Sequence, residues 1–219
     1  MKLEGCEFPE QLLYDVELMA WARVEGEALR IGITSTFAAL AGRLERLTLK
    51  PRGTRISRGG ALGGLEGPRY FGLARSPVSG IIEEINDEAL RRPKLVNDYP
   101  YTLGWLVRLV RFDHREVAGL RPLQACKEEL LEQVRRLRVR CFSAFPDYEM
   151  FEIGLECAAV LPKLDELMAK ISPGEVVHLV SDDPTAPIEM VRWASQRGQE
   201  LLEVTKEGNL FHIIVRKAK

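Results

Sequence analysis

The spacing of apolar residues changes along the chain, and this change limits the possible fold more than any other feature. In the first hundred residues, short alternating apolar runs at 20–24, 28–33 and 44–49 are separated by Glu-Gly or Pro-Arg-Gly. Runs of this kind predict the strands of a sandwich or a flattened barrel. Beyond about residue 147, segments with helical spacing alternate with segments that have strand spacing. We therefore expect an α+β protein with two domains of different architecture.

The last seventy residues predict a specific order of elements. Strands are expected at 148–153, 176–180, 201–204 and 211–215, and helices at 158–171 and up to about residue 196. Ser172-Pro-Gly-Glu ends the first of these helices, because proline and glycine interrupt helical hydrogen bonding. The order β-α-β-α-β-β predicts a two-layer α/β sandwich in which both helices cover one face of the sheet.

A single long helix is expected between these parts, at about 122–138. Pro122 suits a first helical turn, and the apolar stripe consists of Leu123, Cys126, Leu130, Val134 and Leu137. Cys126 lies on this stripe, so we interpret it as a core residue. The composition shifts at Ser143-Ala-Phe-Pro-Asp147. The predicted organisation is a β domain at 1–110, a helical connector at 111–145 and an α/β domain at 146–219.

The charge distribution bears on partners and location. The chain has a net charge of −1, whereas residues 146–219 alone hold 13 acidic and 8 basic groups, a net −5. The arginines of 135–140 suit the negative end of a helix dipole, so a nucleic-acid patch is the weaker interpretation. No stretch approaches the roughly 20 apolar residues of a membrane helix. The N-terminus also lacks the apolar run of a signal peptide. We expect a cytoplasmic protein that binds neither nucleic acid nor membrane.

The cysteines and histidines give no metal-binding pattern. Cys6, Cys126, Cys141 and Cys157 are far apart and form no Cys-x-x-Cys pair, which predicts reduced thiols and no disulfide framework. The three histidines are scattered, so no metal is expected. His178 is interpreted as a strand-face residue. Asp182-Asp183-Pro184 is interpreted as a turn at the start of a helix.

Residues up to about 110 resemble the H protein of the glycine cleavage system, a relative of lipoyl and biotinyl carrier domains. The matching motifs are Leu12-Leu-Tyr-Asp, Trp21-Ala-Arg-Val-Glu-Gly, Ile31-Gly-Ile-Thr, Ser76-Pro-Val-Ser-Gly, Asn86, Leu90, Pro93-Lys-Leu-Val-Asn97, Tyr99-Pro-Tyr101 and Gly104-Trp-Leu106. The resemblance implies a β-rich domain of lipoyl-carrier type. In that family, a hairpin lysine within Glu-Ser-(Val/Leu)-Lys carries lipoate through an amide.

This chain departs from the family at that lysine. Its hairpin reads Leu65-Glu-Gly-Pro-Arg-Tyr-Phe71, which puts Arg69 at the modified position. A guanidinium stays protonated and cannot be acylated as an amine can. No lysine occurs between Lys50 and Lys94, and Ala20 replaces the histidine that often precedes the early Trp in this family. We expect no lipoate and no other cofactor. Lipoylation of some other lysine is the weakest hypothesis.

Residues 147–219 resemble the TusA family of sulfur carriers, also called SirA-like. The match rests on Gly154-Leu-Glu-Cys157, Ser172-Pro-Gly-Glu-Val176, Ser181-Asp-Asp-Pro184, Ile188, Trp193-Ala194, Glu200-Leu-Leu-Glu203 and Ile214-Val-Arg-Lys217. In that family, the cysteine of Gly-Leu-x-Cys-Pro-x-Pro carries a persulfide. A desulfurase or rhodanese-type donor supplies the sulfur, and another protein accepts it. The resemblance implies that Cys157 is the carrier residue.

The surroundings of Cys157 depart from the family in three places. Ala158 and Val160 replace the two prolines, and Phe151 replaces the acid six residues before the cysteine. Because Cys157 directly precedes a predicted helix, the helix dipole is expected to favour its thiolate. Loss of the prolines could instead bury the sulfur. Both outcomes stay open at this stage.

Two hypotheses of function follow. The first is a sulfur relay, with a persulfide on Cys157 and the N-terminal domain as a docking module; it would transfer sulfur between proteins rather than turn over a small molecule. The second is a non-catalytic scaffold or regulatory protein built from two degenerate carrier domains. The reactivity of the Cys157 thiol distinguishes the two.

Overall fold

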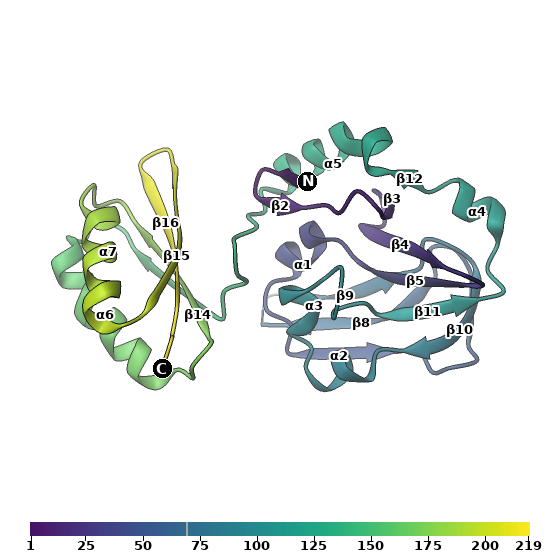
Figure 1. The fold of residues 1–219 in the computed structure, drawn as a ribbon, viewed down its shortest axis with the longest axis horizontal. Coiled ribbons are helices and arrows are strands. Elements are labelled where there is room, and N and C mark those ends of the chain that lie inside the picture. Colours follow the sequence, from purple (N-terminus) through teal and green to yellow (C-terminus); the bar gives the residue numbers. More distant parts are fainter. Residues whose placement is uncertain (69) are drawn as a thin grey trace. The chain divides into compact units, whose positions relative to one another are not determined.

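The computed structural model describes residues 1–68 and 70–219 and divides the chain into two compact units (Figure 1). Unit 1 spans Met1–Cys141 and unit 2 spans Phe142–Lys219. Each unit has a core of its own, so each is described by itself.

Unit 1 is rich in short strands, as the alternating runs predict. Its strands are β1 (Lys2–Leu3), β2 (Cys6–Glu7), β3 (Leu13–Asp15), β4 (Ala20–Glu25), β5 (Ala28–Ile33), β6 (Arg46–Leu49), β7 (Arg55–Ile56), β8 (Ala61–Gly67), β9 (Tyr70–Arg75), β10 (Gly80–Ile85), β11 (Val107–Val110) and β12 (Arg121–Pro122). Its helices are α1 (Ser35–Ala41), α2 (Asp87–Arg91), α3 (Leu95–Asp98), α4 (His114–Ala118) and α5 (Leu123–Leu137).

Two flattened sheets share the main core of unit 1. One has seven strands in the order β12-β3-β4-β5-β11-β10-β7, and the other has the order β6-β8-β9. Leu29 and Leu109 of the first sheet lie in one apolar cluster with Leu47 and Leu65 of the second. The sandwich prediction is confirmed, and the described strands do not close into a barrel.

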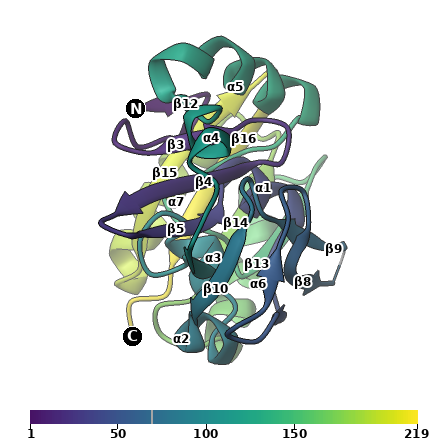
Figure 2. The same ribbon diagram turned by 90° about the vertical axis from the view of Figure 1, so that its right-hand side faces the viewer.

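The long helix α5 belongs to unit 1, which corrects the prediction of a separate connector at 111–145. Figure 2 shows α5 above β12 and β3. Four residues of its predicted stripe, all but Leu137, pack into a second cluster with Phe8, Tyr14 and Trp21 from the start of the chain. The predicted stripe is real, but sequence spacing could not reveal that the N-terminal segment covers it. Cys126 is buried in this cluster, as predicted.

Cys6 and Cys141 form a disulfide, so the prediction of four reduced thiols is wrong for this pair. The two residues lie 135 positions apart, and their Cα atoms are 4.8 Å apart. That separation suits a disulfide. Packing of α5 against the N-terminal segment brings them together, and no local spacing in the sequence carries that information. Cys126 and Cys157 are free thiols.

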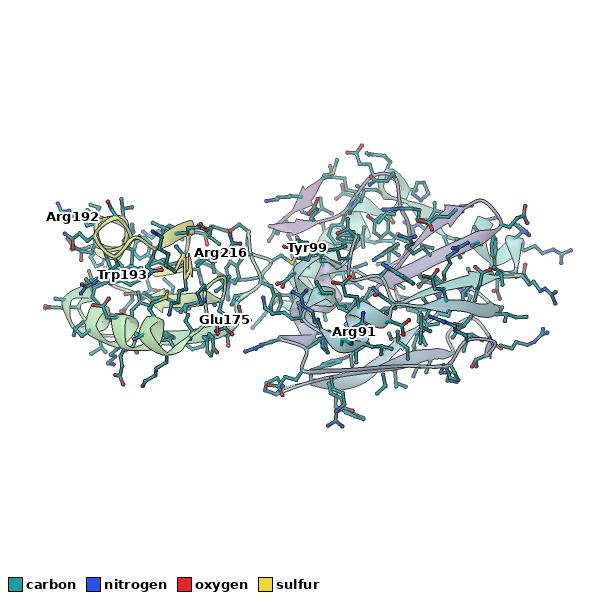
Figure 3. All side chains as sticks on the ribbon, turned by 60° about the horizontal axis from the view of Figure 1, so that its bottom comes forward. Arg91, Tyr99, Glu175, Arg192, Trp193 and Arg216 are labelled. Carbon is teal, nitrogen blue, oxygen red and sulfur yellow. A yellow bond between two sulfur atoms is a disulfide. The ribbon has the colours of Figure 1, made fainter. Side chains whose placement is uncertain are left out.

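Unit 2 has the predicted order of elements. They are β13 (Tyr148–Glu152), α6 (Cys157–Lys170), β14 (Val176–Ser181), α7 (Ala186–Arg197), β15 (Glu200–Glu207) and β16 (Leu210–Arg216). The sheet order is β13-β14-β16-β15, with β13 parallel to β14 and the other pairs antiparallel. Both helices cover one face (Figure 1). Trp193 of α7 faces α6, where its Nε1–H donates to Asp165 at 2.9 Å (Figure 3). The two-layer sandwich is confirmed.

The opposite face of this sheet carries two buried histidines. Nε2 of His178 on β14 lies 3.0 Å from Nδ1 of His212 on β16. The ring of Phe142 packs on both, with centroid distances of 4.5 and 6.2 Å. His178 is a strand-face residue, as interpreted from the sequence, although its pairing with His212 was not foreseen.

Within the described part of the chain, none of the helices combines the length and the apolar character that crossing a bilayer requires.

Candidate functional site

Cys157 is the first residue of α6, where a loop from β13 enters the helix. Gly154 in this loop has φ = +77°, a left-handed conformation that glycine adopts without strain. Glu156 is the N-cap and makes no side-chain capping bond. The free backbone N–H groups at the start of α6 therefore need acceptors from elsewhere.

Of two aspartates after β14, Asp183 supplies such an acceptor and Asp182 binds the loop that enters the helix. Asp182 accepts the N–H of Gly154 at 2.8 Å, and Asp183 accepts the N–H of Cys157 at 2.5 Å. Asp183 also accepts the backbone N–H and the hydroxyl of Thr185, both at 2.8 Å. These bonds from Thr185 and Cys157 lower the pKa of Asp183, so its carboxyl is ionised at neutral pH. The turn predicted at 182–184 thus also caps the helix that bears Cys157.

A hollow of about 660 Å³ opens beside Cys157. Its apolar wall includes Leu155, Ala158, Leu161 and Pro184. Its acidic wall consists of Glu156, Asp182, Asp183 and Glu189. Among the described residues, four carboxylates and no basic side chain line this hollow, so an incoming group meets negative charge near Cys157.

The surroundings of Cys157 oppose ionisation of its thiol. The residue is only 3% exposed. Burial raises the pKa of the Cys157 thiol, and the negative charges of Asp183 and Glu189 raise it further. Asp183 accepts the N–H that was expected to favour a thiolate, and it adds a full negative charge nearby. Burial and these carboxylates therefore oppose the effect that the helix dipole was expected to have on the thiol.

The residues at the two family proline positions differ in solvent exposure. Ala158 is exposed on the wall of the hollow, whereas Val160 is buried in the core of unit 2. Pro162 lies inside α6, where it has no N–H to donate to the carbonyl of Ala158. Phe151 points away from the helices and packs edge-on against His178. Val160 thus contributes a core contact that keeps the start of α6 on the sheet.

The second predicted site residue, Arg69, lies outside the described residues. The hairpin on either side of it is described: β8 pairs with β9 from Ala61↔Arg75 to Gly67↔Tyr70. Phe71 on this hairpin is 80% exposed. The two expected hairpin strands, β8 and β9, are therefore paired.

Sequence reasoning missed the role of Asp183 and Glu189 at Cys157. Ser181-Asp-Asp-Pro184 was noticed as a turn, and the parallel pairing of β13 with β14 is what places it beside Cys157. A βαβ unit puts the ends of both parallel strands at one edge of the sheet, so this signal was available.

Among the described residues, no group of three or more His, Cys, Asp or Glu side chains is arranged to hold a metal ion.

Comparison with known protein families gives two adjoining matches. The family described as "Glycine cleavage H-protein" matches residues 12–133, and the family described as "Sulfurtransferase TusA" matches residues 152–217. Cys157 and the whole acidic wall lie within the second match. At the coarse level, this match supports a sulfur-carrier role.

Individual relatives resemble the first part of the chain. "Glycine cleavage system H protein 5" of Aquifex aeolicus is 36% identical over 145 residues, which cover 64% of this chain and 98% of the relative. "Probable glycine cleavage system H protein 2" of Saccharolobus solfataricus is 31% identical over 140 residues, covering 63% and 95%. A solved H protein from Mycobacterium marinum matches with a TM-score of 0.45 and 27% identity over 51% of this chain and 97% of that one.

Proposed function

Because the chain belongs to the glycine cleavage H-protein family and carries a TusA domain after that part, we propose that it is a sulfur-relay protein in which Cys157 carries a persulfide. The observation that carries this proposal is the place of Cys157 at the start of α6, on the wall of an open hollow within the TusA match. A protein sulfur donor and a protein acceptor are the partners of this relay.

The proposed chemistry needs only the thiolate and the donor. The Cys157 thiolate attacks the outer sulfur of a donor persulfide, R–S–SH. The new S–S bond forms on Cys157 as the donor's S–S bond breaks, which leaves Cys157–S–SH and the donor thiolate R–S⁻. An acceptor thiolate later attacks the outer sulfur in the same way. No electrons are gained or lost overall.

The acidic wall supports a basic partner. A lysine or arginine placed in the hollow would pair with Asp183 and Glu189, the two carboxylates that raise the pKa of Cys157. This pairing opposes their effect and lowers the pKa of the thiol. Docking of the correct partner would therefore generate the reactive thiolate, whereas the free protein stays unreactive.

The H-protein-like unit serves as the docking module in this proposal, without lipoate. Arginine at position 69 offers no acylable amine. The sequence has no lysine from 51 to 93 that could replace it. The exposed Phe71 on the hairpin provides an apolar contact for a partner.

Intact mass spectrometry tests the relay. The protein, a Cys157→Ala variant and a matched Cys126→Ser variant are each incubated with a cysteine desulfurase and cysteine, or with a rhodanese-type donor. We expect a sulfur adduct that reductant removes in the parent and in Cys126→Ser, and no adduct in Cys157→Ala. An unmodified parent, or an adduct that persists in Cys157→Ala, would contradict the proposal.

The burial of Cys157 favours a second candidate, a scaffold that carries no sulfur. In that case, Cys157 would react with iodoacetamide as slowly as Cys126 even when a basic partner is bound. The relay predicts that a donor protein speeds alkylation of Cys157 and leaves Cys126 unchanged.

A further inference from the structure

The acidic wall of the hollow beside Cys157 holds two kinds of carboxylate. Asp182 and Asp183 accept backbone N–H groups of the segment that leads into α6, so hydrogen bonds fix both carboxylates in place. Glu156 is an exposed N-cap residue without a capping bond, and Glu189 is a half-buried residue of the first turn of α7. The first pair is part of the loop structure, so its negative charge is present before any ligand arrives.

The basic side chain that pairs with this wall does not cancel its charge. Arg192 lies 3.0 Å from Glu189, but its side chain is 67% exposed and it is not among the residues that line the hollow. An exposed ion pair of this kind is weak, and salt screens it. Residues 146–219 as a whole hold 13 acidic and 8 basic groups. The hollow therefore keeps a negative charge where a sulfur compound would approach Cys157.

This charge acts on the sulfur compounds that could react with the thiol. Hydrosulfide, thiosulfate and the persulfides of acidic thiols are anions at neutral pH. Attack by the Cys157 thiolate on such an anion would gather like charges beside four carboxylates, which disfavours both the approach and the reaction. A donor that carries an ammonium or guanidinium group near its sulfur pairs with the same carboxylates instead. Selection between two ligands commonly combines a repulsive element with an attractive one, and this wall supplies both.

We propose that the acidic wall determines which sulfur donors react at Cys157: it excludes small anionic sulfur compounds and admits sulfur that arrives beside a lysine, an arginine or another cation. This inference rests on the proposed function, because it names the class of donor that the relay takes. Glu156 and Glu189 are the specificity-determining residues that can be changed without breaking the bonds of Asp182 and Asp183.

Thiol–disulfide exchange with three small disulfides of different charge tests the proposal. Cystamine is a dication, hydroxyethyl disulfide is uncharged, and dithiodipropionate is a dianion. The thiolate attacks one sulfur, the S–S bond of the probe breaks, and one half leaves as a thiolate while the other half stays on the protein. The full chain is used as Cys126→Ser, which leaves Cys157 as the free thiol. Intact mass gives each rate, which is divided by the rate of a small neutral thiol with the same probe, because leaving groups differ in reactivity.

We expect the normalised rate to fall from cystamine to hydroxyethyl disulfide to dithiodipropionate. At low salt, the first and last rates should differ by at least about tenfold, and high salt should reduce this ratio. Glu156→Gln combined with Glu189→Gln should reduce the ratio severalfold. The matched control combines Glu166→Gln with Glu200→Gln, which removes the same charge from exposed residues that do not line the hollow. It should keep the ratio of the parent.

Equal normalised rates for the three probes, or no exchange with any of them, would overturn the proposal. So would an equal fall of the ratio in both double variants, because the net charge of unit 2 would then act rather than the wall. The sulfur adduct formed with a desulfurase tests the relay separately. An adduct on Cys157 without charge selection would contradict this proposal alone. Charge selection without an adduct would contradict the relay and confirm the effect of the wall on the thiol.

Discussion

Each unit has one position that its family resemblance assigns to a carried group, and these two positions differ in what has changed. On the hairpin of unit 1, we propose that Arg69 stands where the H-protein family has its lipoyl lysine, so that the residue that would hold the group is replaced. At the start of α6, the thiol that we propose as the sulfur carrier, that of Cys157, is present, and carboxylates surround it. A missing amine cannot be restored by any partner, whereas a raised pKa can be lowered by a neighbouring cation. The difference suggests that only unit 2 retains carrier chemistry.

The sharpest test of this comparison is Arg69→Lys. If unit 1 lacks only the amine, the variant should accept lipoate from a lipoate–protein ligase, where the parent accepts none. Intact mass would show one added lipoyl group. An Arg52→Lys variant, with its new lysine in an exposed turn of unit 1, controls for indiscriminate acylation. An unmodified Arg69→Lys chain would mean that unit 1 has also lost the surface that the ligase recognises.

Reduction of the disulfide should lower the stability of unit 1 and leave that of unit 2 unchanged. Cross-links that close loops of a hundred or more residues stabilise proteins by about 2–5 kcal/mol. We expect reduction to lower the free energy of unfolding of unit 1 by an amount of this order and to leave unit 2 unchanged. Hydrogen exchange read by mass spectrometry, peptide by peptide, measures both. Equal loss of protection in residues 148–216 would show that the units unfold together.

The pH dependence of alkylation tests the environment of Cys157. Because its pKa is raised, little thiolate exists at pH 7, and the rate should rise about tenfold per pH unit from pH 7 to 9. Asp183→Asn and Glu189→Gln each remove a negative charge while keeping the shape, so each should speed alkylation severalfold at pH 7. A rate that is already flat near pH 7, or slower in both variants, would mean that Cys157 is ionised at rest.

The sequence predicted features that depend on neighbouring residues and missed those that depend on residues far apart in the chain. Strands and helices were predicted because apolar spacing is a local property, and α5 illustrates this, since four of its five predicted stripe residues lie in the core. The Cys6–Cys141 bond joins residues 135 apart, and only the packed fold brings them together. The pKa of Cys157 depends on Asp183, which is 26 positions away and adjacent only through the βαβ unit. Charges brought close by the fold thus oppose the helix-dipole effect that one helix alone led us to expect.

The smallest expected effect concerns the missing proline after Cys157. Proline is tolerated in a first helical turn because the N–H it lacks has no helical acceptor there, and it disfavours helical backbone in the residue before it. Ala158→Pro should therefore move Cys157 out of the first turn and expose its sulfur, raising alkylation at pH 7 by a few fold with a stability change of about 1 kcal/mol or less.

In the control Ala159→Pro, the replaced N–H donates to the carbonyl of Glu156, so that proline should cost stability without the same gain in rate. If the two variants react alike, the family proline does not act through the position of the cysteine. The acidic wall would then account for the low reactivity by itself.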